Sequence, residues 1–321
     1  MHFLVTGGAG FIGSHLCEKL IHLGHRVTCV DNFNAYYDPS IKRHNIRQLV
    51  KQPQFRLIDG DILRWRRMRD LFFDEIPDAV IHLAARAGVR PSIKNPRLYQ
   101  KVNIEGTLRL LELARTANVS KFIMASSSSV YGNNKKIPFS EDDNVDFPIS
   151  PYAATKKACE LLGYTYHSLY QLPVTCLRFF TVYGPRQRPD MAIHKFTRCI
   201  VEGRPIPLFG DGNSRRDYTY ITDIVDGILK AIEKCEQYHI YNLGESQTTI
   251  LSRLIALLEE AVGKPAKIQW LPSQPGDVAV TYADISKSKN ELGYYPKVPV
   301  KKGIPQFVSW YLEELSGGTG R

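Results

Sequence analysis

Short apolar runs alternate with helix-like periodicity through the first half of the chain. Between the first two runs, Leu16 and Leu20 lie one helical turn apart and predict a helix over about 11–23, with Gly24 as its C-cap. Strands that alternate with helices form a parallel sheet covered by helices on both faces. We therefore predict an α/β fold with a doubly wound parallel sheet. Its expected strands lie at residues 3–6, 26–31, 55–59, 79–83, 121–126 and 174–178.

The second half of the chain is less regular. Prolines and a turn-rich segment at 210–214 interrupt it, which predicts a smaller lobe closing over the carboxyl ends of the parallel strands. We expect one domain over 1–185, a C-terminal lobe over 186–315 with the chain crossing between the two, and an unstructured tail over 316–321. The helical patterns of this half lie near 192–203, 222–234 and 249–263.

Composition narrows the class of protein. The 321 residues are 43% hydrophobic and 23% charged, and no apolar run approaches the roughly 20 residues that a membrane helix needs. The first residues run directly into a glycine turn and do not resemble a signal peptide. The six cysteines and nine histidines show no metal-ligand spacing. We expect a cytoplasmic globular protein with no metal site and no membrane partner.

The net charge of +10, from 42 basic and 32 acidic residues, is compatible with nucleic-acid binding. The densest basic run, at 64–69, nevertheless has the pattern of a solvated helix face. A positive field also attracts polyanionic small molecules. Charge alone leaves these classes open, and only the candidate chemistry separates them.

Three glycines, Gly7, Gly10 and Gly13, stand between the first predicted strand and its helix. In a dinucleotide-binding turn they permit the tight turn, the close approach of backbone to a pyrophosphate, and helix–strand packing. Free amides at the helix start then hold the phosphates. Asp31 ends the second strand, where a carboxylate accepts from ribose hydroxyls and repels a 2′-phosphate. This context predicts a Rossmann-type domain that binds NAD rather than NADP.

Two further pairs of residues fit the same pocket. Asp61 and Ile62 follow the third strand, where a carboxylate can accept a hydrogen bond from the adenine amine. Ala84 and Ala85 end the fourth strand, and their small side chains allow a cofactor to lie against the backbone. Both pairs therefore support the predicted dinucleotide site.

Tyr152 and Lys156 open a helix after Ser-Pro, and a spacing of four puts both side chains on one face. A lysine ammonium beside a phenol favours the phenolate, which lets the tyrosine act as a base near neutral pH. Serines at 126–129 end the fifth strand, about 25 residues upstream. A hydroxyl there can hydrogen-bond an alcohol that is being oxidised and pass its proton to Tyr152. The combination predicts oxidation of a substrate hydroxyl.

These residues match a known family over nearly the whole chain, to about residue 310. The sequence resembles the extended short-chain dehydrogenase/reductase superfamily, specifically its NAD-dependent nucleotide-sugar epimerases and dehydratases. The resemblance implies that Tyr152 is the base, that Lys156 is its modulator and a ribose ligand, and that Ser127 is the catalytic hydroxyl. The matching stretches are TGGAGFIGSH (6–15), HLAA (82–85), 103–107, SSSSVYG (126–132), SPYAATK (150–156), 178–188, 216–223 and 275–277.

The resemblance also implies two sets of binding residues and an assembly. Gln274 stands where the family usually has an arginine, so one expected phosphate contact is in doubt, and Arg90 is a candidate replacement. The family often dimerises through helices near 94–116 and 150–170, so a homodimer is expected. The expected NAD contacts are Gly7, Gly10, Phe11, Ile12, Gly13, Asp31, Asn32, Asp61, Ile62, Ala84, Ala85, Asn103, Lys156 and Phe179. The expected UDP-sugar contacts are Arg90, Ser127, Ser128, Ser129, Tyr152, Thr181, Arg188, Arg216 and Asp277.

Within this family the reaction depends on the residues after the catalytic hydroxyl. Dehydratases carry an Asp-Glu pair there, where this chain has Ser128 and Ser129, and serine cannot replace a carboxylate in that role. The glucuronate decarboxylases carry a glutamate at the position of Ser129. The resemblance therefore implies epimerisation at C4 through a transient 4-keto sugar.

Thr181 bears on which sugar the substrate carries. Glucose 4-epimerases commonly have asparagine there, whereas Thr181 with the following Gly-Pro-Arg-Gln-Arg-Pro-Asp-Met resembles the UDP-glucuronate 4-epimerases. A hydroxyl and a guanidinium suit the C6 carboxylate of that substrate, although Arg186 and Arg188 also fit generic phosphate binding or surface charge. The expected reaction interconverts UDP-glucuronate and UDP-galacturonate. The alternatives are a UDP-glucose 4-epimerase, a UDP-glucuronate decarboxylase, another nucleotide-sugar oxidoreductase, or a regulatory protein on a dinucleotide-binding fold.

Overall fold

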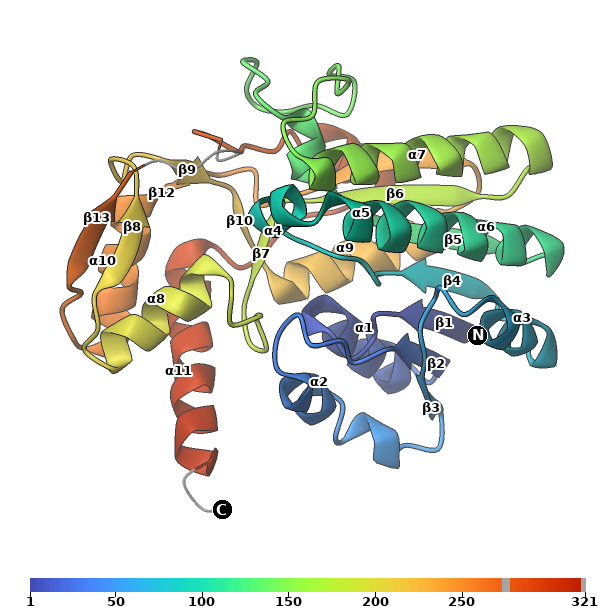
Figure 1. Cartoon of the computed structure of the whole chain (residues 1–321), viewed down its shortest axis with the longest axis horizontal. Helices are drawn as coiled ribbons and strands as arrows, with labels where there is room; N and C mark the ends of the chain where they lie inside the picture. Colours follow the sequence, from blue (N-terminus) through green and yellow to red (C-terminus); the bar gives the residue numbers. More distant parts are fainter. Residues whose placement is uncertain (273–277, 319–321) are drawn as a thin grey trace.

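Seven parallel strands form the centre of the molecule, in a computed structural model that describes residues 1–272 and 278–318 (Figure 1). Their order, β11-β6-β5-β4-β1-β2-β3, reverses between β1 and β4, which is the arrangement of a doubly wound sheet. The predicted α/β fold is confirmed. The strands of this sheet are β1 (His2–Thr6), β2 (Arg26–Asp31), β3 (Phe55–Asp59), β4 (Ala79–His82), β5 (Lys121–Ser127), β6 (Val174–Phe179) and β11 (Tyr238–Leu243).

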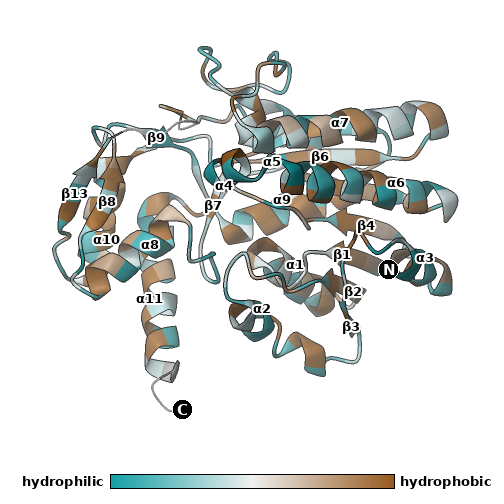
Figure 2. Cartoon of the chain, in the orientation of Figure 1, coloured by the Kyte–Doolittle hydropathy of each residue, from teal (hydrophilic) through white to brown (hydrophobic). Residues whose placement is uncertain are grey.

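Helices cover both faces of the sheet, whose strands contain many hydrophobic residues (Figure 2). Apolar side chains of these strands pack into two separate cores, one on each face. Val5 and the other strand side chains on its face of the sheet pack toward α1 and α9. Leu4 and the strand side chains on the opposite face pack toward α3, α6 and α7. Successive residues of one strand thus enter two different cores. These helices are α1 (Phe11–His22), α3 (Trp65–Asp74), α6 (Gly106–Thr116), α7 (Pro151–Tyr170) and α9 (Ile221–Glu233), with shorter helices α2 (Pro39–Asn45), α4 (Val89–Lys94) and α5 (Pro96–Tyr99) beside them.

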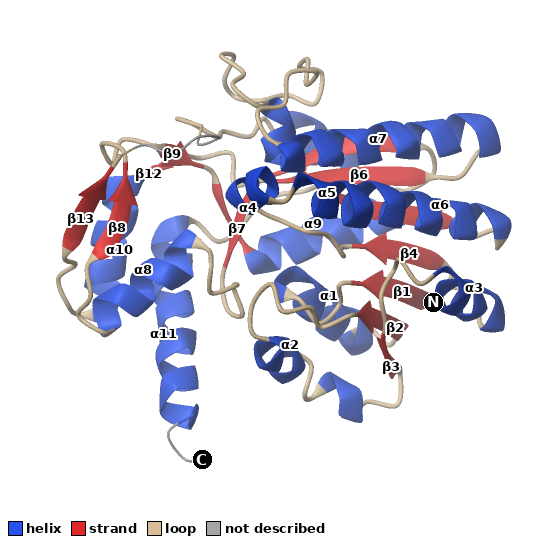
Figure 3. Ribbon diagram, viewed as in Figure 1, coloured by secondary structure: helices blue, strands red, loops and turns tan. Residues whose placement is uncertain are grey.

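The remaining elements gather at one side of the sheet, beside the carboxyl ends of its strands (Figure 3). Three small two-stranded sheets, β10-β7, β12-β9 and β13-β8, accompany three helices. The helices are α8 (Ala192–Val201), α10 (Leu251–Val262) and α11 (Val300–Gly318). The strands are β7 (Thr181–Tyr183), β8 (Ile206–Phe209), β9 (Arg215–Arg216), β10 (Tyr218–Tyr220), β12 (Thr249–Ile250) and β13 (Ile268–Leu271).

Two features concern the C-terminal half of the chain. The segment expected to form the C-terminal lobe also supplies α9 and the edge strand β11, which pairs with β6 in the large sheet. The predicted tail is wrong for residues 316–318, because α11 continues through Gly318. Leucine and glutamate at 312–315 favour helix and carry it past the expected end. Residues 319–321 lie outside the described part of the chain.

Candidate active site

A pocket of about 510 Å³ opens at the carboxyl ends of the sheet strands, and its volume falls in the range of about 300–1,000 Å³ that is typical of small-molecule sites. The segments that follow β1 to β6 all contribute to its walls. Most of the predicted contacts therefore meet in one place. Those that line it are Gly7, Gly10, Phe11, Ile12, Gly13, Asp31, Asn32, Asp61, Ile62, Ala84, Ala85, Ser127, Ser128, Ser129, Tyr152, Lys156, Phe179, Thr181 and Arg188.

The glycine turn at one end of the pocket leaves no room for side chains. Gly7 adopts a φ of +72°, and a Cβ there would lie 2.7 Å from the Ala84 nitrogen. A Cβ on Gly13 would lie 2.2 Å from the Gly7 carbonyl oxygen. Gly10 is the N-cap of α1 and no side chain caps this helix, so its first amides are available to an anion. The turn fits the pyrophosphate of a dinucleotide.

Asp31 lies beside this turn with a partner that the sequence did not indicate. Its carboxylate accepts from the amides of Ala9 at 3.2 Å and Phe33 at 2.9 Å, and the Lys42 ammonium lies 3.8 Å away. Burial raises the pKa of Asp31, and Lys42 acts in the opposite direction. Lys42 is itself buried and lines the pocket. Both charges of this pair therefore lie at the edge of the pocket.

The expected catalytic side chains come from two elements. Ser150 caps α7 by accepting from the Ala153 amide at 3.1 Å, and this cap fixes the helix start that carries Tyr152. Lys156, one turn later, donates to the Ala125 carbonyl at 2.7 Å.

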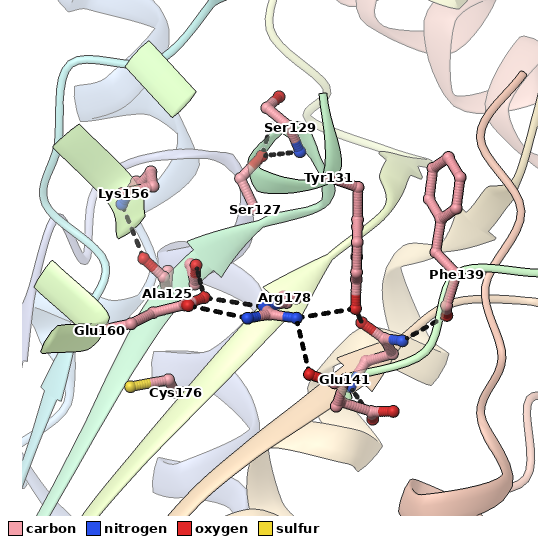
Figure 4. A network of polar contacts seen from close by, with 12 residues as sticks. Ala125, Ser127, Ser129, Tyr131, Phe139, Glu141, Lys156, Glu160, Cys176 and Arg178 are labelled. Carbon is pink, nitrogen blue, oxygen red and sulfur yellow. Dashed lines mark hydrogen bonds and ion pairs between the residues drawn. The ribbon is translucent and has the colours of Figure 1, made fainter. Parts of the chain in front are cut away.

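Ser127 ends β5, and its hydroxyl donates to the Ser129 hydroxyl at 3.1 Å and accepts from the Ser129 amide at 3.2 Å (Figure 4). Tyr152, Lys156 and Ser127 all border the pocket. The arrangement can remove a proton from a hydroxyl held between them.

The opposite wall carries cations that stack on an aromatic ring. Arg188 pairs with Asp190 through two hydrogen bonds of 2.9 and 2.8 Å, and its guanidinium lies 5.3 Å from the Tyr36 ring centroid. Arg86, which the sequence reading missed, lies 5.9 Å from the same ring. Both arginines line the pocket, where Asp190 balances the charge of Arg188 and Arg86 adds a positive charge to this wall.

Three predicted contacts lie outside the pocket lining. Asn103 is buried behind the lining. Its side-chain amide accepts a hydrogen bond from the backbone N–H of Arg86 at 2.8 Å and donates one to the backbone carbonyl of Arg86 at 3.0 Å, so Asn103 shapes the wall by holding the Arg86 backbone. Arg90 stacks on Phe209 at 4.5 Å. Arg216 donates to two backbone carbonyls beside β9. Asp277 and Gln274 lie outside the described residues.

Three side chains that line the pocket were not predicted from the sequence. Lys42 and Tyr36 come from the segment after the second strand, which carries no motif, and Arg86 directly follows the HLAA stretch at 82–85. Their one common cue is position, since each follows a strand whose carboxyl end faces the ligand site. That rule identifies candidate segments, and the side chains that turn inward depend on packing.

Known proteins share this architecture and these motifs. Residues 3–244 match the NAD dependent epimerase/dehydratase family. A UDP-glucuronate 4-epimerase of Thermodesulfobacterium geofontis is 45% identical over 315 residues, which are 98% of this chain and 97% of that protein.

Two solved structures are similar throughout. A UDP-glucuronic acid 4-epimerase of Bacillus cereus, in complex with UDP-glucuronic acid and NAD, has a TM-score of 0.93 and 40% identity over 98% of this chain and 100% of its own. A UDP-glucose 4-epimerase of Thermotoga maritima, with UDP-glucose, has a TM-score of 0.91 and 35% identity over the same shares. Pocket, motifs and relatives agree, and the chain belongs to the NAD dependent epimerase/dehydratase family.

Proposed function

We propose that this chain is an NAD-dependent 4-epimerase that interconverts UDP-glucuronate and UDP-galacturonate. The observation that carries the proposal is the meeting of Tyr152, Lys156 and Ser127 with Thr181 in one cationic pocket. The relatives from Bacillus cereus and Thermodesulfobacterium geofontis that are named for this activity support it. The sheet domain holds the cofactor, and the elements beside the strand ends, around Arg188 and Arg216, hold the nucleotide sugar.

In the proposed mechanism the protein moves a proton and holds a ketone. Tyr152 removes the proton of the C4 hydroxyl, while Ser127 hydrogen-bonds the same oxygen and Lys156 stabilises the phenolate. When bound, NAD supplies first the acceptor and then the donor of the C4 hydride. The pocket must let the 4-keto sugar present its other face, after which Tyr152 returns the proton.

The uronate imposes a further requirement. Oxidation at C4 creates a β-keto acid, which loses carbon dioxide when the carboxylate stands perpendicular to the ketone plane. An epimerase must therefore hold that carboxylate out of the reactive alignment. Thr181, with the serines at 127–129 on the same pocket, is the candidate grip.

Substituting Thr181 tests this grip. We expect Thr181→Ala to raise the KM for UDP-glucuronate by roughly tenfold, the effect of one lost hydrogen bond to a charged group. The variant should also release some UDP-pentose by decarboxylation. Steady-state kinetics with NMR of the products measures both effects. A variant with the wild-type KM and no pentose would remove Thr181 from the carboxylate site.

UDP-glucose is the second candidate substrate, because the Thermotoga maritima structure that binds it is also similar throughout. The deciding experiment gives a panel of UDP-sugars to the purified enzyme without added cofactor and resolves the products by NMR. We expect the uronates to turn over much faster than UDP-glucose and UDP-galactose. Preference for UDP-glucose would contradict the uronate proposal and leave the 4-epimerase chemistry standing.

The proposal also covers the oligomeric state and the cellular location of the enzyme. Large apolar side chains stand exposed along α7, including Leu161 at 55% and Leu169 at 64%, beside the exposed Leu108 of α6. Contiguous exposed apolar surface marks an association site, which supports a homodimer through these two helices. We place the enzyme in the cytoplasm, where NAD and nucleotide sugars are both at hand. None of the helices within 1–272 and 278–318 is long and apolar enough to span a membrane.

A further inference from the structure

A polar row crosses three neighbouring strands on the sheet face that α6 and α7 cover. Ser126 of β5 is the register partner of Arg178 on β6, and Arg178 is the partner of Asn242 on β11. The three residues are 4%, 1% and 0% exposed. Two residues earlier on the same strands, Met124 and Cys176 belong to the apolar core of that face. At the ends of these strands, buried polar side chains therefore occupy positions that would otherwise hold apolar core side chains.

Glu160 of α7 forms hydrogen bonds with two members of this row, Arg178 and Ser126. Its carboxylate receives two parallel hydrogen bonds of 2.9 Å from the Arg178 guanidinium, and both side chains are 1% exposed (Figure 4). The Ser126 hydroxyl donates to the same carboxylate at 2.6 Å. Paired hydrogen bonds between arginine and carboxylate restrict direction as well as distance.

The other end of the row is also fully bonded. Arg178 donates to the Tyr131 hydroxyl at 3.0 Å, and that hydroxyl donates to the Asn242 side chain at 2.7 Å. The Asn242 amide donates onward to the carbonyls of Phe139 and Asp284 at 2.9 and 3.0 Å. A buried ion pair is weak evidence for stability, because desolvation offsets the attraction. The fully connected network therefore calls for another explanation.

The position of the network supplies that explanation. Glu160 follows Lys156 by one helical turn and Tyr152 by two, and Ser126 directly precedes Ser127. Helix α7 is thus bound to β5 twice in succession, by Lys156 to the Ala125 carbonyl and by Glu160 to Ser126. Along β5, the two bonded residues, Ala125 and Ser126, directly precede Ser127.

We propose that Glu160, Arg178 and Ser126 are positioning residues that set the distance between the Tyr152 phenol and the Ser127 hydroxyl. This proposal rests on the catalytic roles proposed above. Apolar packing is non-directional, whereas the paired hydrogen bonds of Arg178 and Glu160 restrict direction as well as distance. A displacement of 1 Å in a reacting group can cost on the order of 100-fold in rate. Hydrogen bonds that fix the position of α7 on β5 to within less than an ångström are therefore sufficient to affect catalysis.

The test removes one bond and keeps the ion pair. Ser126→Ala deletes the hydroxyl that joins β5 to Glu160, and Ser126→Thr retains a hydroxyl. We expect Ser126→Ala to lower kcat about tenfold, with the KM for UDP-glucuronate and the Kd for NAD within about twofold of wild type. We expect Ser126→Thr to recover most of the rate. Glu160→Gln, which keeps the shape of the side chain, should also lower kcat.

Tyr166→Phe is the matched control. It removes a different hydrogen bond of the same helix, the 2.9 Å bond from Tyr166 to Glu112 on α6, away from the pocket. We expect it to lower the melting temperature and leave kcat unchanged. A wild-type kcat in Ser126→Ala, or an equal fall in Tyr166→Phe, would overturn the positioning role. Wild-type enzyme that interconverts no UDP-sugar would instead overturn the proposed function, and Tyr152→Phe provides the inactive reference.

Discussion

Single side chains carry the selectivity of the pocket, and Asp31 is the clearest case. Its carboxylate repels a 2′-phosphate, yet the Lys42 ammonium 3.8 Å away would attract one. We therefore propose that selection of NAD over NADP depends on the balance of two opposite charges at one edge of the pocket. Removing either charge alone should shift that balance in a predictable direction.

We expect Asp31→Asn to raise the affinity for NADP roughly tenfold, because the change leaves the Lys42 charge uncompensated beside the 2′-phosphate. The affinity for NAD should fall, since a ribose hydroxyl loses a charged acceptor. Direct titration of both cofactors measures the two constants. In Asp31→Asn with Lys42→Met the gain for NADP should disappear. Unchanged discrimination in the single variant would contradict the role of Asp31.

Glu245, just after β11, is a buried acid outside the pocket. Burial, followed by the charges of Asp223 and Asp217, raises its pKa from 4.5 to about 8. Between about pH 4.5 and 8 this carboxyl is protonated in the folded chain and ionised in the unfolded chain. The folded state then binds more protons, so its stability falls as the pH rises through that window.

Glu245→Gln should remove this pH-dependent loss. The free energy of unfolding of the variant should match wild type near pH 4.5 and exceed it by on the order of 4 kcal/mol at pH 8. Urea denaturation at the two pH values measures the difference. An offset of equal size at both would show that Glu245 does not titrate in this window.

At the scale of elements, the N-terminus of α1 depends on contact between backbones. A Cβ on Gly13 would lie 2.2 Å from the Gly7 carbonyl and 2.7 Å from the Gly8 Cα, so the first turn of the helix must shift. In the proposed cofactor site, the helix amides and the turn bind a pyrophosphate together. Their relative position is therefore part of the cofactor site.

We expect Gly13→Ala to weaken NAD binding by about 1.4 kcal/mol or more, which is roughly tenfold in Kd. Gly24, just past the other end of α1, is the matched control because a Cβ there meets nothing within 4 Å. Its φ of +80° means that Gly24→Ala should cost about 1 kcal/mol of stability and leave NAD binding unchanged. Calorimetric titration with NAD compares the two, and equal effects would argue against a local role for Gly13.

At the scale of the whole molecule, the exposed apolar side chains of α6 and α7 predict a dimer. Light scattering should give a mass near twice 36.5 kDa for the wild type. Leu161→Glu should shift the mass toward 36.5 kDa, because a charge would be buried at the proposed interface. Leu312→Glu on α11, 40% exposed and elsewhere on the surface, should not. A monomeric wild type would refute the predicted assembly.

Much of this organisation follows from local pattern. The strands at 26–31 and 55–59 have the predicted bounds, because short runs rich in apolar and β-branched residues between turn-forming residues indicate strands. The glycine turn and the spacing of Tyr152 and Lys156 are equally local, since backbone sterics and helical periodicity fix them within a few residues. These features determined the fold class and the cofactor, and they are the basis for proposing Tyr152 as the base.

Tertiary structure decided which other side chains meet them. Asn103 turned out to support Arg86 from behind the pocket wall, and β11 joined a sheet whose other strands all precede residue 180. The row of Ser126, Arg178 and Asn242 exists because three strands far apart in sequence pair in one register. Register and packing depend on the whole sheet at once, so they cannot be predicted from the spacing of residues along the chain.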